Sequence, residues 1–258
     1  MQIPFNKYHG TGNDFIIIDN REGNFNPSDT ILINKLCHRR FGIGADGLIL
    51  ISLHDKFNFE MKYFNSDGKE GSMCGNGGRC TAAFALRAGI AGKKQKFFAF
   101  DGPHEAEIGN ENIRLQMSDV TSITKIKGNY FINTGSPHYI QFIKNVKEFD
   151  VFNEGKKIRW SDDFKPGGTN VNFVELSDNG IYVRTFERGV EDETLSCGTG
   201  VTASAIATVL AGHFDTNIIS VRTPGGNLSV ELKPGEGKVT GIRLSGPATF
   251  VFEGMIEV

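Results

Sequence analysis

Apolar and polar residues alternate along most of this chain in short runs, which is the pattern of half-buried β-strands. Gly, Asn and Asp bound the runs and mark the turns between them. In the first half the predicted strands are residues 15–19, 48–53, 59–64, 97–100, 105–108 and 113–117. A helix is predicted at residues 76–88, ended by Gly89, and another in the amphipathic segment that runs to Arg40, with Ser28 or Asp29 as its N-cap.

The second half repeats this order of elements. A helix is predicted at residues 199–211 and ends at Gly212. This helix is apolar nearly all round, which predicts burial on every side. The strands that follow are predicted near residues 218–222, 227–232, 238–244 and 248–252. A curved antiparallel sheet that encloses its own helix would account for both observations.

The two halves are also similar residue by residue. Cys74 begins the segment CGNGGRCTAAFALRAG, and Cys197, 123 residues later (197 − 74), begins CGTGVTASAIATVLAG. The same offset relates Thr11-Gly12 to Thr134-Gly135 and Leu48–Ile51 to Val171–Val174. An ordered series of matches at one offset indicates an internal duplication.

We therefore predict an α+β fold of two pseudo-symmetric domains, each a curved, mostly antiparallel sheet wrapped around a central helix. A length of 258 residues suits two domains of ordinary size. The predicted domains are residues 1–118, which contain the first Cys-Gly-x-Gly segment, and residues 119–251, which contain the second.

Composition and charge exclude several classes of function. A net charge of −2 gives no basic field for nucleic acid or an acidic membrane surface. No signal peptide and no apolar stretch of bilayer length are apparent. Four cysteines in a chain of this length do not make a disulfide scaffold. A cytoplasmic protein is the simplest interpretation.

Cys-Gly-x-Gly at a helix start points to acid–base chemistry. A thiol in the first helical turn lies beside unpaired N–H groups and the positive end of the helix dipole, which lower its pKa. The glycines allow close approach of a ligand, and the N–H groups near Gly75, Asn76, Gly198 and Thr199 could bind a substrate carboxylate. Two such thiols across one cleft could remove a proton from one face of an amino-acid carbon and return one to the other.

Such a reaction builds negative charge on the substrate carboxylate, and pre-aimed backbone donors would stabilise it. Neither a PLP lysine motif nor a metal-ligand cluster is apparent, and Cys74 with Cys80 matches no usual zinc spacing. We therefore expect neither a cofactor nor a metal. The loop at residues 42–47 is superficially similar to a dinucleotide loop, but it precedes a predicted strand instead of a helix.

Three long motifs resemble the diaminopimelate epimerase family. The first runs from Asn65-Ser66-Asp67-Gly68 to Cys74-Gly75-Asn76-Gly77 and Arg79, and the second from Glu187-Arg188-Gly189 to Cys197-Gly198-Thr199-Gly200. The opening segment, residues 9–15, also matches, as do residues 135–138 and 170–171. Together these motifs span residues 9 to 200.

The resemblance implies interconversion of LL- and meso-diaminopimelate in the synthesis of lysine and peptidoglycan precursors. It implies that Cys74 and Cys197 are the acid/base pair and that His138 and Glu187 assist them. It further implies that substrate is held, largely at its distal end, by Asn13, Asn65, Asn170, Glu187 and Arg188. The family also suggests that a last strand, residues 252–258, joins the first domain. A homodimer is one oligomeric state that the sequence leaves open.

Alternatives of other classes remain. A proline or hydroxyproline racemase uses the same two-thiol logic, but usually has His where Asn76 stands and lacks a residue like Arg188. A non-catalytic amino-acid-binding relative, or a phenazine-type isomerase, would be expected to lose one thiol, and this chain keeps both. Cys37 and Cys80 are interpreted as small buried hydrophobic residues.

Overall fold

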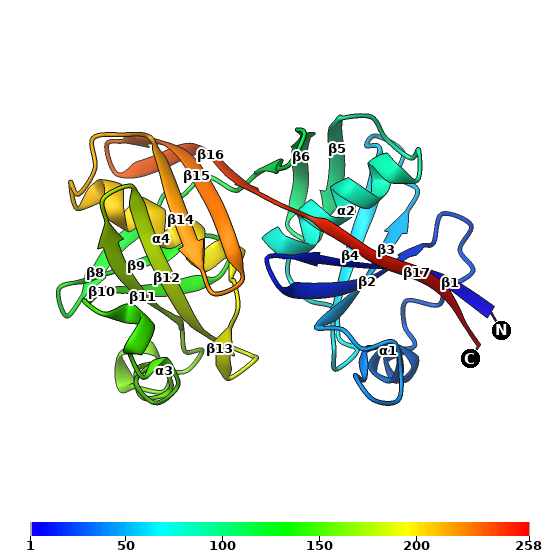
Figure 1. Cartoon of the computed structure of the whole chain (residues 1–258), viewed down its shortest axis with the longest axis horizontal. Coiled ribbons are helices and arrows are strands. Elements are labelled where there is room, and N and C mark those ends of the chain that lie inside the picture. The colour runs from blue at the N-terminus through cyan, green and yellow to red at the C-terminus, as the bar shows by residue number, and fades with distance from the viewer. Residues whose placement is uncertain (1, 258) are drawn as a thin grey trace. The chain divides into compact units, whose positions relative to one another are not determined.

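The computed structural model describes residues 2–257 and divides the chain into two compact units (Figure 1). Unit 1 comprises the residues up to Leu115 together with those from Gly246 onward, and unit 2 comprises Gln116–Ser245. Val258, the end of the predicted last strand, lies outside the described residues.

Unit 1 is built from a sheet of mostly antiparallel strands with a central helix and a second, shorter helix. Its elements are β1 (Gln2–Gly10), β2 (Asn13–Asp19), α1 (Thr30–Cys37), β3 (Gly47–Ser52), β4 (Phe59–Asn65), α2 (Gly75–Arg87), β5 (Lys94–Ala99), β6 (Gly102–Ile108), β7 (Ile113–Gln116, whose last residue falls in unit 2) and β17 (Thr249–Glu257). Neighbouring strands pair antiparallel except for β2 with β3 and β4 with β5, which are parallel. Helix α2 packs against β1, β2, β3, β4, β6 and β17.

Unit 2 has the same construction. Its elements are β8 (Ile123–Ile126), β9 (Asn129–Asn133), β10 (Pro137–Phe142), α3 (Val151–Arg159), β11 (Asn170–Ser177), β12 (Gly180–Glu187), β13 (Asp192–Thr194), α4 (Gly198–Leu210), β14 (Ile218–Thr223), β15 (Gly226–Gly235) and β16 (Lys238–Gly246, whose last residue falls in unit 1), with short 3-10 turns at Val146–Glu148 and Asp162–Phe164. Here β10 with β11 and β12 with β14 are the parallel pairs. Helix α4 packs against β9, β10, β11, β12, β14 and β15.

The strand register repeats between the units with the offset found in the sequence. Phe15 on β2 lies opposite Gly47 on β3, and His138 on β10 lies opposite Asn170 on β11. Both residues of the second pair follow those of the first by 123 positions, so this pair of parallel strands has the same register in both units. The duplication is therefore structural as well as sequential.

Both central helices are buried as predicted. In α4 every residue from Gly200 to Thr208 is buried, and in α2 every residue from Gly75 to Ala82. Such a helix cannot face water on any side, which explains why its sequence has no polar stripe. The predicted α+β architecture, with each sheet enclosing a helix, is confirmed.

Five elements differ from the sequence-based expectation: one helix is shorter, and four elements were not predicted. Helix α1 starts after the predicted N-cap Asp29 but ends at Cys37 and does not reach Arg40. The chain turns back at Gly42, where a Cβ atom would lie 2.1 Å from the Lys35 carbonyl oxygen. Strands β1, β8 and β9 and helix α3 were not predicted, since their apolar residues form no clear periodic run.

The last strand is longer than expected. The strand predicted at residues 248–252 is the first part of β17, which continues to Glu257 and pairs along its length with β1. In Figure 1 β17, in red, runs beside β1, in dark blue, within unit 1. The segment was expected as two strands because residues 248–252 were predicted from the apolar pattern, whereas residues 252–258 were implied by the family resemblance. No turn signal separates the two at residue 252, and they form one strand.

Candidate active site

Each unit places one cysteine at the start of its central helix. Cys74 is the N-cap of α2 and Cys197 the N-cap of α4, and both have extended backbone angles (φ −105°, ψ 120° and φ −112°, ψ 112°). Neither thiol caps its helix by a hydrogen bond. The thiols therefore lie at the positive end of the helix dipole, where negative charge on sulfur is stabilised. Cys74 is half-buried, whereas Cys197 is buried, with 7% of its surface exposed.

Cys74 contacts an asparagine whose orientation is fixed by its neighbours. The Asn13 side chain donates to Asp46 Oδ2 at 2.7 Å, and a carboxylate can only accept. The Asn13 oxygen must therefore point the other way, where it accepts from Asn76 Nδ2 at 3.2 Å and lies 3.6 Å from Cys74 Sγ. The Asn76 oxygen in turn accepts from Arg79 at 2.9 Å, and a guanidinium can only donate. The Asn76 nitrogen must therefore face Asn13, which agrees with the orientation deduced from Asp46.

Arg79 brings a fully buried positive charge to the start of α2. Its guanidinium donates to the carbonyl oxygens of Gly75 and Pro247, both at 3.4 Å, and to Thr11 Oγ1 at 3.5 Å. Burial lowers the pKa of Arg79 because water no longer solvates the charge. None of the carboxylates in residues 2–257 is paired with it. A cation held in this way stabilises negative charge that develops nearby, on the Cys74 sulfur or on a bound anion.

A cluster of charged side chains fixes the position of Asp46, the carboxylate that orients Asn13. Lys7 Nζ contacts the Gly44 carbonyl oxygen and forms an ion pair with Asp14 at 2.7 Å. Asp14 forms a second ion pair, with Arg39, also at 2.7 Å. Burial alone would raise the pKa of Asp14, but the hydrogen bonds from Arg39 and Lys7 outweigh it and hold the pKa below its usual range. Arg39 also reaches Asp46 at 2.6 Å, so the carboxylate that orients Asn13 is itself fixed.

Around Cys197 the polar groups form a chain. Cys197 Sγ lies 3.4 Å from Thr199 Oγ1, and Thr199 Oγ1 lies 2.9 Å from His138 Nε2. The other ring nitrogen of His138, Nδ1, is 3.1 Å from Asn172 Nδ2. Asn172 further donates to the Tyr139 carbonyl oxygen at 3.2 Å and accepts from Thr185 Oγ1 at 3.0 Å. His138 and Asn172 are fully buried.

Burial lowers the pKa of His138 to about 3, so the imidazole is neutral at pH 7. The unfolded chain binds a proton there below the ordinary value of 6.5, whereas the folded protein does so only near pH 3. Acidification between these values therefore lowers the free energy of unfolding, by up to about 1.4 kcal/mol per pH unit from this residue.

We expect His138→Gln to remove that contribution. The difference in free energy of unfolding between the protein and this variant should shrink steadily as the pH falls from 6 to 4, measured by urea titration. His213→Gln, at an exposed histidine, is the control for the effect of replacing a histidine by glutamine. A constant difference for His138→Gln would show that the imidazole is charged in the folded state.

The remaining predicted residues of unit 2 are Asn170 at the start of β11, Glu187 at the end of β12 and Arg188 in the loop that follows. Glu187 accepts from Thr194 Oγ1 at 2.9 Å and is half-buried, whereas Arg188 is exposed. Buried Asn170 accepts from the Arg188 backbone N–H at 2.8 Å and donates to Ser136 Oγ at 2.8 Å. Asn170 thereby fixes the backbone from which the Arg188 side chain extends.

The same loop is braced by an ion pair. Arg159, on α3, pairs with Glu191 at 3.0 Å, and Glu191 also accepts from the Gly189 N–H at 3.0 Å. Glu191 has a positive φ of 59°, a strained conformation for a residue with a side chain. The ion pair with the buried Arg159 side chain compensates for this strain and holds the turn that follows Arg188.

Within each unit the structure brings together most of the residues that the sequence singled out. In unit 1, Asn13, Cys74, Gly75 and Asn76 form one cluster, and in unit 2, Cys197, Gly198, Thr199 and His138 form another. Asn65 is exposed at the end of β4. The sequence missed Asp46, Arg79, Asn172 and Thr185 as parts of these clusters. Arg79 belongs to the first family motif, but nothing in the sequence marks it as buried beside Cys74. Asn172 is a polar residue among apolar neighbours of β11, and this was the signal that could have identified it.

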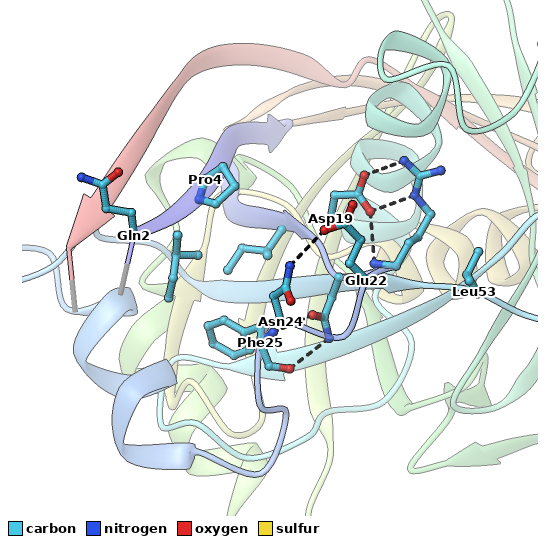
Figure 2. Close-up of a pocket in the computed structure, with 11 residues that line it drawn as sticks. Gln2, Pro4, Asp19, Glu22, Asn24, Phe25 and Leu53 are labelled. Atoms are coloured by element: carbon cyan, nitrogen blue, oxygen red, sulfur yellow. Dashed lines mark hydrogen bonds and ion pairs between the residues drawn. The ribbon is translucent and has the colours of Figure 1, made fainter.

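A separate pocket of about 540 Å³ lies in unit 1, away from these residues (Figure 2). Polar side chains that line it form hydrogen bonds within the protein. Asp19 accepts from Arg21 at 2.7 and 2.9 Å, and the Asn20 side chain donates to the Phe25 carbonyl oxygen and accepts from the Phe25 N–H. None of the predicted site residues lines it. Across residues 2–257, no cluster of metal-ligating side chains occurs, and no helix is both long and apolar enough to cross a bilayer.

Solved structures with the same fold include epimerases. The chain is similar to a phenazine biosynthesis protein of the PhzF family from Bacillus anthracis, with a TM-score of 0.82, 16% identity and full coverage of both chains. It is also similar to a hydroxyproline epimerase from Agrobacterium vitis, with a TM-score of 0.74 and 11% identity over 99% of this chain and 92% of that one. At these identities the likeness establishes the fold alone, and the chain has the fold of this class of proteins.

Sequence relatives identify the family within the class. A family model described as diaminopimelate epimerase matches residues 5–123 and 130–251. The diaminopimelate epimerase of Flavobacterium psychrophilum is 53% identical over 96% of this chain and 97% of its own length. That of Chlorobaculum tepidum is 43% identical over 96% and 99%. The chain belongs to the diaminopimelate epimerase family, and the resemblance found in its motifs is confirmed.

Proposed function

We propose that the protein interconverts LL- and meso-diaminopimelate, with Cys74 and Cys197 as the acid/base pair and one thiol supplied by each unit. The observation that carries this proposal is the repeated placement of a cysteine, unused as a cap, at the N-cap of a buried helix in both copies of a duplicated unit. Family membership at 53% identity over nearly the whole chain supplies the substrate.

The reaction inverts one α-carbon without any net change in protons. A thiolate removes the α-proton and becomes a thiol, while the second thiol delivers its proton to the opposite face and becomes a thiolate. The negative charge that develops on the α-carboxylate is stabilised by N–H groups at the starts of α2 and α4, near Gly75, Asn76, Gly198 and Thr199. The buried Arg79 charge adds to this stabilisation.

The distal amino-acid end of the substrate is assigned to polar residues of the family motifs. Arg188 offers a guanidinium that can hold a carboxylate in a bidentate pair. Asn13, Asn65, Asn170 and Glu187 supply amide and carboxylate groups for the remaining contacts. His138 supports Cys197 through Thr199. Glu187, which is held by Thr194, is assigned an assisting role at the reacting carbon by the family resemblance.

The proposal is tested by incubating the purified protein with LL-diaminopimelate in deuterium oxide, under reducing conditions and without added cofactor. Meso product should form with deuterium at the inverted carbon, since a thiol in deuterium oxide delivers deuterium. Epimerised product without label would exclude the two-thiol route. Turnover of L-proline in place of diaminopimelate would instead support the racemase alternative.

Arg188→Ala is expected to raise KM for diaminopimelate about tenfold or more, because the variant loses the charge that pairs with the distal carboxylate. Lys165→Ala, at another exposed cation of unit 2, serves as the control. Steady-state kinetics of both variants measure the effect. An unchanged KM in Arg188→Ala would remove Arg188 from the substrate site.

A further inference from the structure

A chain of buried polar side chains leads through unit 2 to Cys197. Its members contact one another in the order Thr185, Asn172, His138, Thr199 and Cys197, with distances of 3.0, 3.1, 2.9 and 3.4 Å. Buried polar side chains lower stability unless every member is satisfied. The direction of each hydrogen bond can be deduced from groups that can only donate or only accept.

Asn172 fixes the direction at the inner end. Its Nδ2 lies 3.2 Å from the Tyr139 carbonyl oxygen, which can only accept, so this atom is the amide nitrogen. Its Oδ1 accepts the hydroxyl hydrogen of Thr185 at 3.0 Å, which agrees with the same orientation. The second hydrogen on Nδ2 then points at His138 Nδ1.

This orientation determines the tautomer of His138. A ring nitrogen that receives an N–H from Asn172 must carry a lone pair, so Nδ1 is unprotonated. The single proton of the neutral ring is therefore on Nε2, and Nε2 donates it to Thr199 Oγ1 at 2.9 Å. Since Thr199 Oγ1 accepts this bond, its own hydrogen is available to Cys197 Sγ at 3.4 Å.

Unit 1 lacks this chain, although the scaffold is the same. The residues 123 positions earlier are Ile49 in place of Asn172 and Phe15 in place of His138, and both are fully buried apolar side chains. The position that corresponds to Thr199 is Asn76. A duplicated core that accepts an apolar pair at these positions does not need the polar pair for folding, which points to a role in the chemistry of Cys197.

We propose that Asn172 is a positioning residue that sets the tautomer of His138 and thereby directs the Thr199 hydroxyl hydrogen at the Cys197 sulfur, stabilising its thiolate. The inference rests on the proposed function, in which Cys197 alternates between thiol and thiolate. No proton moves along the chain: each bond keeps its hydrogen, and only the charge on sulfur changes. His138 then does not exchange protons with the substrate.

The charged groups around this chain agree with a neutral ring. The positive charge of Arg188 acts to lower the pKa of His138, in the same direction as burial. Glu187 is engaged by Thr194 Oγ1 at 2.9 Å. On the opposite side the ring is packed against Gly200, where a Cβ atom would lie 3.3 Å from His138 Cε1.

The first test reads the tautomer directly. In protein labelled with 15N-histidine, the nitrogen chemical shifts of His138, assigned with His138→Gln, should show a proton on Nε2 and none on Nδ1 at pH 7. In Asn172→Asp the carboxylate can only accept, so a proton should appear on Nδ1. A proton on Nδ1 in the unaltered protein, or none on Nδ1 in Asn172→Asp, would overturn the proposal.

The second test reads the thiolate. The rate of alkylation of each cysteine by iodoacetamide is followed by mass spectrometry as a function of pH, with Cys74 as the internal reference. In Thr199→Val the midpoint for Cys197 should rise by about one pH unit, because a hydrogen bond to the charged sulfur is lost. Thr199→Ser keeps the hydroxyl and should keep the midpoint.

The outcomes separate this inference from the proposed function. An unchanged Cys197 midpoint in Thr199→Val would show that the hydroxyl does not stabilise the thiolate, while the two-thiol mechanism would stand. The pH midpoint of alkylation of each cysteine is also measured in the denatured protein. If neither Cys74 nor Cys197 had a lower midpoint in the folded protein than in the denatured protein, the acid/base assignment itself would fail.

Discussion

Alanine at position 74 or at position 197 is expected to lower kcat for epimerisation by at least about a thousand-fold. Each substitution removes one of two groups that must act on opposite faces of the same carbon, and alanine has no acidic or basic group to replace the thiol. The loss should be similar for the two variants, because inversion needs both a proton acceptor and a proton donor. Turnover of LL-diaminopimelate to the meso form measures it.

The other two cysteines provide matched controls. Cys37 is buried beside the charged cluster of unit 1, and burial raises the pKa of its thiol to about 12. Cys80 is fully buried in α2, and burial raises the pKa of its thiol as well. Neither thiol can act near pH 7, so Cys37→Ala and Cys80→Ala should retain kcat once the fraction of folded protein is matched. Near-normal turnover in Cys74→Ala or Cys197→Ala would exclude the two-thiol mechanism.

Much of the fold was predictable because the two halves of the chain carry the same sequence pattern of strands and a central helix. The offset between the Cys-Gly-x-Gly segments also relates strand residues such as Leu48 and Val171, and the pairing of β2 with β3 and of β10 with β11 follows the same offset. A helix as apolar as α4 can only be buried, and so its enclosure by a sheet was predictable too.

The limits of α1 and the course of β17 depend on contacts that no local pattern encodes. Helix α1 ends at Cys37 because Gly42 packs against the carbonyl groups of its last turn. Strand β17 extends to Glu257 because β1 provides a partner for it at the other end of the sequence. Since β1 itself has mixed polar and apolar residues, neither strand could be recognised alone.

The thiols were predictable from their motifs, but their surroundings were not. Asn172 follows Val171 in a strand of apolar residues, and its role depends on His138 from a neighbouring strand and on Thr199 from a helix. Comparison of the two halves would have identified it, since the position 123 residues earlier is Ile49. Arg79 was likewise visible as part of a motif, but its burial without a carboxylate partner required the structure.

The second glycine of each Cys-Gly-x-Gly segment gives a matched pair of positions for a further prediction. At Gly200, an added Cβ atom would lie 2.4 Å from Asn172 Oδ1 and 3.4 Å from the Cys197 Cβ. At Gly77, the nearest atoms would be Ile49 Cδ1 at 3.2 Å and Met61 Cε at 3.3 Å. The first contact is an overlap with a buried amide that is fixed by hydrogen bonds, whereas the second involves the ends of flexible side chains.

Gly200→Ala is therefore expected to lower the free energy of unfolding by about 2 kcal/mol and kcat by more than tenfold, because Asn172 must leave its position and His138 loses its partner. In Gly77→Ala the tight contacts oppose the higher helix propensity of alanine, worth about 1 kcal/mol, so stability should change little. Urea titration and steady-state kinetics of both variants measure the contrast. Equal effects at the two positions would show that the Asn172 side chain moves without cost, and that the polar chain does not hold it in place.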